Sequence, residues 1–404
     1  MEKAVIIAHK FRLYPNKKQE VKLLETLELC RQTYNFLLNE LNRQKVVDKS
    51  QIQSIIPDMK ICDPKLKKVY SKTLQYESYR LFSNLKALSQ LKKKGKKIGR
   101  LRSKGKGWFK TFTYNQSGFK LIKTGKRCQI LHLSKIGDIR IRCHRGVKGK
   151  VKQIMIKKEV SGKWFAFVIE ELSKENPQLK PIRKVIGIDV GLTDIVYDSD
   201  GNKISNPRHL KKHSEKLALL QRKMSKKKKS SNNRNKMRVR LTRQYEKLLN
   251  ARNDFLHKLS KYYVDNYDAI GMEDMIITNM VNSRLAKHIL DASWGKLRQM
   301  IAYKAERAGK LYMLVDHKGT TQRCSNCGEK VAKNLSERIH KCPFCGFEAP
   351  RDYNSALDIK RLTLKKIFEI GQELPESTLV KMGSLPSNWH VLSMKQEATS
   401  LINS

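Results

Sequence analysis

The chain has 404 residues, which is enough for two to four domains with buried cores, since a usual domain has about 100 to 200 residues. Its 85 lysines and arginines outnumber 37 aspartates and glutamates and leave a formal net charge of +48. This excess is far from the near-neutral balance of ordinary enzymes and predicts salt-sensitive binding to a polyanion such as nucleic acid.

The N-terminal segment alternates over residues 3–13 and predicts a strand, after which a helix is expected to begin near Lys17. Asp63 and Pro64 resemble an N-cap and a first-turn proline, so a second amphipathic helix is expected to follow them directly. We therefore predict a helical lobe over residues 16–104. Its last part, KKKGKKIGRLRSKGKG, carries charges that repel one another unless phosphates intervene, and we interpret it as a linker that faces nucleic acid.

Short β-rich segments follow the predicted lobe. They include RCQILHL, DIRIRC, KQIMIKKEV and KWFAFVIEE, and Ser161-Gly162 supplies a tight hairpin turn between the last two. Together with the N-terminal strand, these segments predict a small β-barrel composed of residues 1–15 and 105–180.

A new α/β domain is expected to begin near Pro181 and to comprise residues 181–318 and 350–372. Its first segment, VIGIDVGLTDIVYDSDGNKI, predicts two strands closed by a turn at Asp200-Gly201.

A long basic helical region is predicted over residues 208–263, with an interruption at KMSKKKKSSNNRNK. Its cationic face lies between two acid-bearing strands in the sequence, and we expect it to contact nucleic acid. Residues 373–404 show weak periodicity and are predicted to form a disordered tail.

Three acids stand in settings that favour catalysis. Asp189 ends the apolar segment VIGID, Glu273 ends AIGME, and Asp352 opens the segment RDYNSALDI. Carboxylates at strand ends can share divalent cations, and magnesium prefers such oxygen ligands. Two magnesium ions about 4 Å apart would activate water and stabilise the leaving oxygen of a phosphodiester. The three acids are therefore the predicted catalytic and magnesium-binding residues.

Other charged residues near these acids have weaker claims. Asp358, Asp194 and Asp274 are equally well explained as charges on a helix surface or in a turn, so we leave them outside the predicted site. Arg351 and Arg338 are candidates for neutralising a bound phosphate.

Four cysteines form the pattern CSNCG and CPFCG, in which each pair is followed by a glycine that permits a tight turn. Their thiolates predict a closed tetrahedral zinc site with a structural role, in a zinc ribbon over residues 319–349. The zinc ligands are Cys324, Cys327, Cys342 and Cys345. The remaining cysteines are predicted to be reduced thiols: Cys30, Cys62, Cys128 and Cys143.

As a set, these motifs resemble the TnpB family, the RNA-guided nucleases of bacterial and archaeal insertion sequences that are related to compact type V CRISPR effectors. The resemblance includes FRLYPNKKQ, IGIDVGL, GMEDM, TQRCSNCG with CPFCG, and RDYNSALDI, and it covers most of the chain. Members of the family often have asparagine where Asp358 stands.

The resemblance implies a wedge-like β-barrel carrying an inserted helical recognition lobe, and a RuvC nuclease domain of ribonuclease H fold interrupted by the zinc ribbon. It also implies a guide RNA derived from the transposon end and a double-stranded DNA target cut beside a short adjacent motif. A guide heteroduplex held by its backbone would explain the large positive charge. By similarity, Gln75 and Asn115 are candidates for contact with the adjacent motif.

The expected location is the cytoplasm of a bacterial or archaeal cell, with the protein associated with the nucleoid when it is bound to DNA. No apolar run approaches the roughly 20 residues of a membrane helix, and no secretory signal is expected.

Two other functions remain open at this point. An RNA-guided repressor would bind target DNA without cutting it, but such relatives are expected to lack one or more of the three acids. A transposase that joins DNA strands also uses three acids on a ribonuclease H fold.

Overall fold

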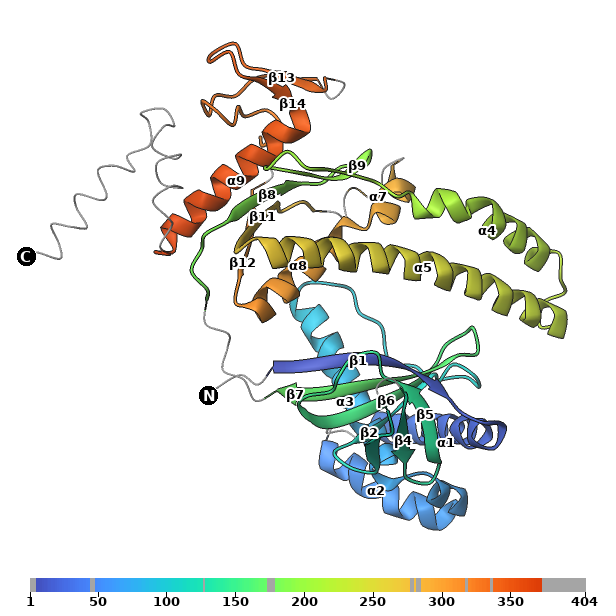
Figure 1. Ribbon diagram of the computed structural model, residues 1–404. Helices are drawn as coiled ribbons and strands as arrows, with labels where there is room; N and C mark the ends of the chain where they lie inside the picture. The colour runs from blue at the N-terminus through green and yellow to red at the C-terminus, as the bar shows by residue number, and fades with distance from the viewer. Residues whose placement is uncertain are drawn as a thin grey trace, which may run out of the picture. The chain divides into compact units, whose positions relative to one another are not determined.

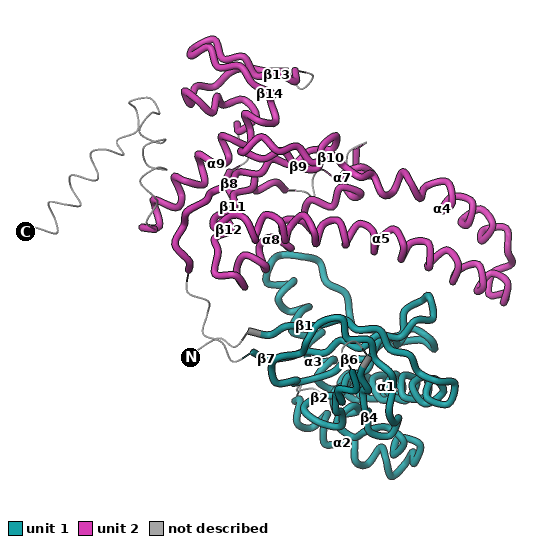
Figure 2. The backbone as a smooth tube through the Cα atoms, in the orientation of Figure 1, with its two compact units in different colours: residues 1–175 teal, residues 176–404 magenta. Residues whose placement is uncertain are grey.

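The computed structural model describes residues 5–43, 48–125, 128–172, 179–276, 280, 285–316, 319–334 and 337–372. The chain divides into two compact units, Met1–Glu175 and Asn176–Ser404 (Figure 2). The predicted tail, 373–404, lies outside the described residues. None of the described helices is long and apolar enough to cross a membrane.

The first unit is built on a seven-stranded antiparallel sheet whose order is β2-β6-β7-β1-β5-β4-β3 (Figure 1). The strands are β1 (Val5–Tyr14), β2 (Thr111–Asn115), β3 (Phe119–Lys123), β4 (Cys128–Leu133), β5 (Gly137–Arg142), β6 (Lys150–Lys158) and β7 (Trp164–Leu172). The predicted turn between β6 and β7 is present, and Gly162 adopts the positive φ of +86° that favours glycine. Among the described strands no ladder joins β2 to β3, so the predicted closure into a barrel is not confirmed.

Helices fill the insertion between β1 and β2. They are α1 (Lys17–Arg43), α2 (Lys49–Cys62), the 3₁₀ helix η1 (Pro64–Lys68) and α3 (Ser71–Lys93). The predicted start near Lys17 is confirmed. Asp63 caps a helix as expected, accepting a hydrogen bond from the Lys65 N–H at 3.0 Å, but the prediction that a long helix follows it directly was wrong. The chain is extended at Val69 and Tyr70 because Val69 is buried and the Tyr70 ring stacks on Tyr114 of β2.

The second unit is built on a mixed five-stranded sheet with the order β10-β9-β8-β11-β12. The strands are β8 (Val185–Asp189), β9 (Asp194–Asp198), β10 (Lys203–Ser205), β11 (Ala269–Glu273) and β12 (Leu311–Val315). Strands β8, β11 and β12 are parallel, whereas β9 pairs antiparallel with β8 and β10. The sequence predicted two strands over residues 185–204, but there are three, and the Asp200-Gly201 turn joins the second to the third.

Side chains alternate across β8 and β11, and helices cover the two faces of the sheet (Figure 1). Ile186, Ile188, Ile270 and Met272 pack with α5 (Asn232–Asn266) and α8 (Trp294–Ala308). Val185 and Ala269 point to the other face, where they pack with Leu364 and Ile367 of α9 (Arg351–Glu369). The sheet therefore has one face covered by α5 and α8 and one face covered by α9.

Two glycines let α9 lie directly on the sheet. A Cβ at Gly187 would stand 2.2 Å from the carbonyl oxygen of Ala356, and a Cβ at Gly271 would stand 1.8 Å from Thr363 Oγ1. Because the helix approaches this closely, the position of its first turn is fixed relative to the ends of β8 and β11.

The remaining described elements are α4 (His209–Ser225), α7 (Ala286–Ala292), β13 (Ile339–Lys341) and β14 (Glu348–Pro350). Helices α4 and α5 form the predicted basic helical region, interrupted between Ser225 and Asn232, and Leu217, Leu241 and Leu248 pack them together.

Candidate functional site

Asp189 and Glu273 end neighbouring parallel strands on the face that α9 covers. Gly187 is paired with Gly271 in the ladder between β8 and β11, so the acids two residues further along each strand lie at the same level and on the same face. Helix α9 runs opposite to these strands, because Leu364 packs near Val185 while Ala356 already lies over Gly187. Its first turn is thereby brought over the strand ends.

Asp352 lies in that first helical turn, not at a strand end. Burial raises the pKa of Asp189 well above its usual value, and the charges of Glu273 and Asp352 raise it further. The Val190 N–H and the Arg351 guanidinium act in the opposite direction. The structure therefore brings all three predicted acids into electrostatic contact, and like charges dominate around Asp189.

This donor set fits magnesium. Carboxylate oxygens are the ligands that magnesium prefers, and a cation among the acids would offset the repulsion at Asp189. Within the described chain, the carboxylate oxygens do not form a cluster whose ligand atoms all lie within 4.8 Å of one another, as the four cysteines do.

Neighbouring side chains orient the acids. The Thr320 hydroxyl donates to Glu273 Oε1, and both residues are buried. Arg351 Nε lies 3.2 Å from Asp352 Oδ1, and its Nη1 donates to the Glu337 carbonyl at 3.0 Å. Of the two arginine candidates, Arg351 thus has its side chain beside the acids. Arg338 contacts this region through its backbone, because its carbonyl accepts from the Arg351 N–H at 2.8 Å.

The turn after Asp189 is fixed by a residue that sequence reasoning missed. Trp294 is buried, and its indole Nε1 donates to the Gly191 carbonyl at 3.2 Å. Thr320 was missed as well, because a threonine in the segment between Gly319 and Cys324 carries no distinguishing pattern.

The three acids left outside the predicted site have separate partners. Asp194 lies 3.3 Å from Lys203 Nζ, and Asp274 lies 2.9 Å from Arg298 Nη2. The interpretation of Asp358 as a surface or turn charge was wrong, because this residue is fully buried and is ion-paired with Arg361 at 2.6 Å and with Arg323 at 3.3 Å. Burial raises the pKa of Asp358 more than the two arginines lower it.

The four predicted zinc ligands come together in the ribbon. Their sulfur atoms all lie within 4.8 Å of one another, with Cys324 Sγ 3.7 Å from Cys345 Sγ and Cys327 Sγ 3.5 Å from Cys342 Sγ. Tetrahedral zinc with Zn–S bonds of about 2.3 Å would separate its sulfurs by roughly 3.8 Å. The cluster can therefore hold a zinc ion.

The ribbon is tied to α9 by direct hydrogen bonds. Asn354 accepts from the Ser325 N–H at 2.9 Å and donates to the Arg323 carbonyl at 2.8 Å, and it is fully buried. Arg323 also pairs with Asp358 through its side chain. A metal that orders the cysteine knuckle would therefore also order the helix that carries Asp352.

The two predicted motif-contact residues lie on adjoining elements of the first unit. Gln75 is on α3 and Asn115 ends β2, and both are half-buried. The two elements are joined by contacts around Tyr70, whose hydroxyl lies 2.8 Å from Ser117 Oγ, and by Arg80, which donates to the Thr111 carbonyl at 3.1 Å.

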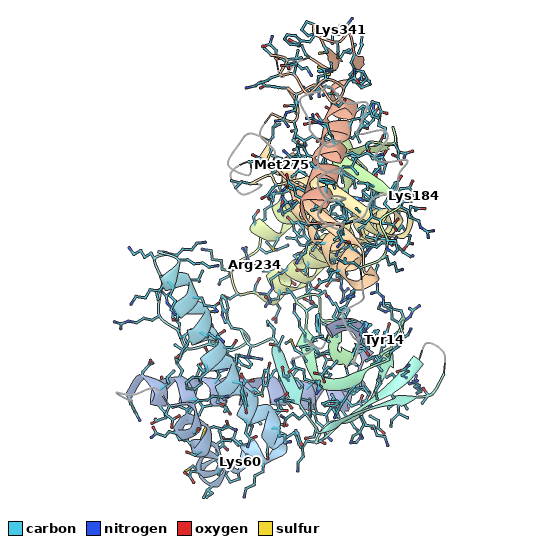
Figure 3. All side chains as sticks on the ribbon, turned by 90° about the vertical axis from the view of Figure 1, so that its left-hand side faces the viewer. Tyr14, Lys60, Lys184, Arg234, Met275 and Lys341 are labelled. Carbon is cyan, nitrogen blue, oxygen red and sulfur yellow. The ribbon has the colours of Figure 1, made fainter. Side chains whose placement is uncertain are left out.

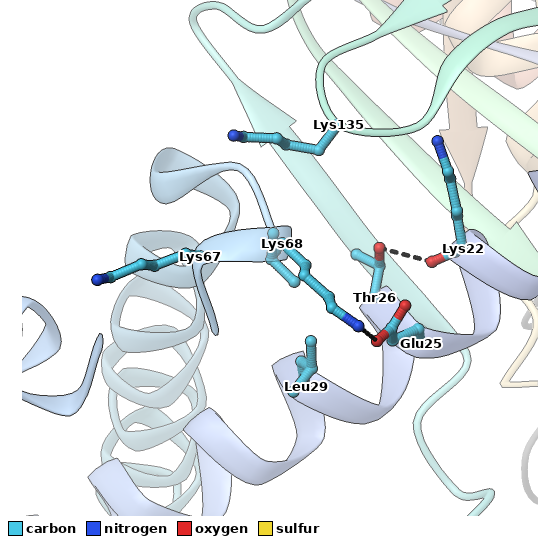
Figure 4. Close-up of a pocket in the computed structure, with 8 residues that line it drawn as sticks. Lys22, Glu25, Thr26, Leu29, Lys67, Lys68 and Lys135 are labelled. Atoms are coloured by element: carbon cyan, nitrogen blue, oxygen red, sulfur yellow. Dashed lines mark hydrogen bonds and ion pairs between the residues drawn. The ribbon is translucent and has the colours of Figure 1, made fainter. Parts of the chain in front are cut away.

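Cationic side chains extend from elements of both units (Figure 3). One group lines a hollow of about 470 Å³ in the first unit, where Lys68 pairs with Glu25 at 2.7 Å (Figure 4). Lys22, Lys67 and Lys135 extend away from that ion pair, so they add positive charge to the surface without converging on one point.

Comparisons with known proteins agree with this arrangement. Family models described as a probable transposase, a Cas12f1-like TNB domain and a helix-turn-helix domain match residues 158–284, 294–359 and 1–45. In the described part of the last range, the chain forms a strand and one helix.

A solved Cas12f1 complex with guide RNA and target DNA shares the fold, with a TM-score of 0.52 at 13% identity over 88% of this chain and 99% of that one. The Cas12f1 endodeoxyribonuclease of Sulfoacidibacillus thermotolerans is 29% identical over 51% of this chain and 52% of its own length.

Two relatives match almost from end to end. A putative RNA-guided DNA endonuclease of Streptomyces pristinaespiralis is 29% identical over 366 residues, which is 87% of this chain and 88% of that protein. The putative RNA-guided DNA endonuclease InsQ of Escherichia coli K12 is 30% identical over 378 residues, which is 87% of this chain and 91% of InsQ. With these motifs in place along the chain, that likeness shows that the chain belongs to the TnpB family.

Proposed function

We propose that this protein is an RNA-guided DNA endonuclease encoded by a transposable element, which cuts guide-matched DNA beside a short adjacent motif. The observation that carries the proposal is the placement of Asp352, in the first turn of α9, over the strand ends that carry Asp189 and Glu273, with like charge crowding Asp189. Crowding acids together is unfavourable unless a cation joins them, so the arrangement supports a metal-dependent site.

In this proposal Asp189, Glu273 and Asp352 hold two magnesium ions. Bound magnesium would supply an activated water and stabilise the leaving oxygen of the phosphodiester. Thr320 orients Glu273 by its hydrogen bond. Arg351 restrains Asp352 and carries a positive charge beside the acids, where the scissile phosphate would lie.

The second unit is, in the same proposal, a RuvC nuclease domain over residues 181–318 and 350–372, with a zinc ribbon over 319–349. The first unit combines a wedge-like sheet domain with a helical recognition lobe over 16–104. Gln75 and Asn115, on the joined elements α3 and β2, would contact the adjacent motif. The guide would be an RNA from the transposon end, bound by backbone contacts that the charge of +48 supports.

The first test is to sequence the RNA that copurifies with the protein. The resulting complex is then incubated with magnesium and a plasmid library that carries the matching target beside a randomised flank. A discrete RNA and cuts beside one flank motif are expected.

The other outcomes separate the alternatives. A discrete RNA with guided binding but no cutting would favour a repressor. Joined DNA ends formed without guide RNA would favour a transposase that joins DNA strands. The family model that matches residues 158–284 is described as a probable transposase.

A further inference from the structure

Trp108 is the most exposed large apolar side chain in the described residues, with 78% of its surface accessible. It stands at the end of the linker between α3 and β2. Single exposed apolar residues are common and often need no explanation. The surroundings of Trp108 set it apart, because the loop that carries it is held in place on both sides.

On the N-terminal side, the loop is fastened to α1 through the backbone of Lys104. Its N–H donates to Asn35 Oδ1 at 2.7 Å, and its carbonyl accepts from Arg31 at 2.8 Å and from the Asn35 amide at 3.0 Å. The Trp108 N–H then donates to the Gly105 carbonyl at 3.1 Å, which closes a tight turn. Gly107 occupies the third position of that turn with φ +77°, where glycine is favoured.

On the C-terminal side, Phe109 is buried and anchors the chain. The Arg80 guanidinium lies 4.5 Å from the centre of its ring, and the Tyr34 ring is 5.9 Å away. Phe109 thereby fixes the backbone directly next to Trp108, whose side chain is exposed. The indole is thus presented to solvent by an ordered loop.

The charge around the loop favours a nucleic-acid partner. Residues 92–110 include ten lysines and arginines and no acid. An indole beside such cations has the two parts of a single-strand binding site, a flat surface for a base and positive charge for the phosphates. Folded RNAs offer unpaired bases for such stacking, whereas duplex DNA keeps its bases stacked.

We infer that Trp108 stacks on an unpaired base of the bound RNA. This rests on the proposed function in so far as that function supplies an RNA partner. The stacking adds affinity that does not depend on salt, on top of the phosphate contacts of the neighbouring lysines.

The test measures the affinity of the full chain for single-stranded oligoadenylate RNA at several salt concentrations. Trp108→Ala is expected to weaken binding roughly 5- to 100-fold at every salt concentration and to leave the slope of log affinity against log salt unchanged. Lys106→Ala should instead lower the slope by about 0.7. Ile61→Ala, at another side chain that is 75% exposed, should change neither.

Tryptophan fluorescence gives a second readout. The chain has four tryptophans. The difference between wild type and Trp108→Phe isolates the emission of Trp108, because the other three indoles are common to both proteins. Oligoadenylate should quench this difference signal, and an abasic ribose-phosphate strand of the same length should not.

Two sets of results would overturn the inference. Equal quenching by the abasic strand, stronger quenching by blunt duplex DNA, or unchanged affinity of Trp108→Ala in a protein that binds RNA would remove the stacking role alone. Failure of the wild-type protein to bind any RNA would remove the proposed function together with it.

Discussion

Helix α9 carries two acids whose surroundings are opposite. Asp352 in the first turn is 40% exposed and lies among like charges, close enough to Asp189 to raise the pKa of that residue. Asp358 further along the helix is fully buried and is held between Arg361 and Arg323. The same helix thus has one end where negative charge accumulates and a middle where it is neutralised.

The difference in charge around Asp352 and Asp358 distinguishes a ligand-binding site from an ion pair that stabilises the fold. Acids that repel one another are stabilised by an added cation, so the charge imbalance around Asp352 indicates a ligand. Asp358 already has its cations within the chain, and one of them, Arg323, comes from the ribbon. Asp358 therefore links the ribbon to the helix that carries Asp352.

The largest effect is expected from Asp189→Asn. Loss of this metal ligand should lower magnesium-dependent cleavage by about a thousandfold, equivalent to about 4 kcal/mol of transition-state stabilisation. RNA affinity should stay within about twofold, because the residue contributes no cation to phosphate binding. Thermal unfolding without magnesium should occur at the same or a higher temperature, since one of the mutually repelling charges is gone.

Asp194→Asn is the matched control for that variant. Asp194 lies on the neighbouring strand β9 and pairs with Lys203, so the substitution should leave cleavage nearly unchanged. A similar loss of cleavage in both variants, or a loss of RNA binding in Asp189→Asn, would contradict the assignment of the metal site to the strand ends.

Cys342→Ser tests the ribbon that supports Asp352 and Asp358 on α9. Loss of one thiolate should reduce the bound zinc to less than one ion per chain. The unfolding temperature should fall with it, because metal binding contributes to local folding. Cleavage should fall because Ser325 and Arg323 of the ribbon no longer fix α9. Zinc content measured by mass spectrometry should be unchanged in Cys62→Ser, whose thiol is exposed and outside the cluster.

Asp358 variants measure how much the buried ion pairs in the middle of α9 contribute to the free energy of unfolding. Asp358→Ala leaves the buried Arg361 without this partner and should lower the free energy of unfolding by about 3 kcal/mol. Asp358→Asn keeps an acceptor for the guanidinium and should cost about 1 kcal/mol. Denaturant titration checks both, and cleavage by the folded fraction should persist. Equal costs would show that charge at this position, and not an acceptor, holds the ribbon to the helix.

The sequence could predict the parts of this site that lie in local patterns. The apolar segments before Asp189 and Glu273 predicted the two strands, and the cysteine spacing predicted the four ligands that the structure brings together. That both acids lie on one face follows from strand alternation together with the register that pairs Gly187 with Gly271, and this register was not predicted from the sequence. That Asp352 lies near these two acids depends on the direction in which α9 runs across the sheet. No local sequence pattern predicts that direction.

Other features depended on packing between distant segments. The burial of Asp358 follows from Arg323, which lies in another motif and supplies the compensating charge. The helix expected after Asp63 is interrupted because the Tyr70 ring packs on Tyr114, far along the chain. Thr320 gains its role only when the ribbon brings it to Glu273. In each case a tertiary contact determines the structure or role of a residue that its local sequence does not predict.

Effects on stability comparable to those of the Asp358 variants are expected at the two glycines that set the distance between α9 and the sheet. Gly271→Ala puts a methyl group against the Thr363 hydroxyl, and Gly187→Ala puts one against the backbone carbonyl of Ala356. Each should lower the free energy of unfolding by about 1 to 3 kcal/mol through overpacking. Denaturant titration of the single variants gives these values.

Residues 187 and 271 can be distinguished by the atoms that an added methyl group would meet. Thr363→Ala removes the atoms that a methyl group at residue 271 would meet, so the double variant Gly271→Ala with Thr363→Ala should recover part of the lost stability. At residue 187 the obstacle is backbone, and no side-chain substitution on α9 should restore stability. Cleavage should fall and recover together with stability in these variants, because a shift of α9 moves Asp352 away from Asp189. Recovery of stability without recovery of cleavage would mean that the helix returns to the sheet in a register that the acids do not tolerate.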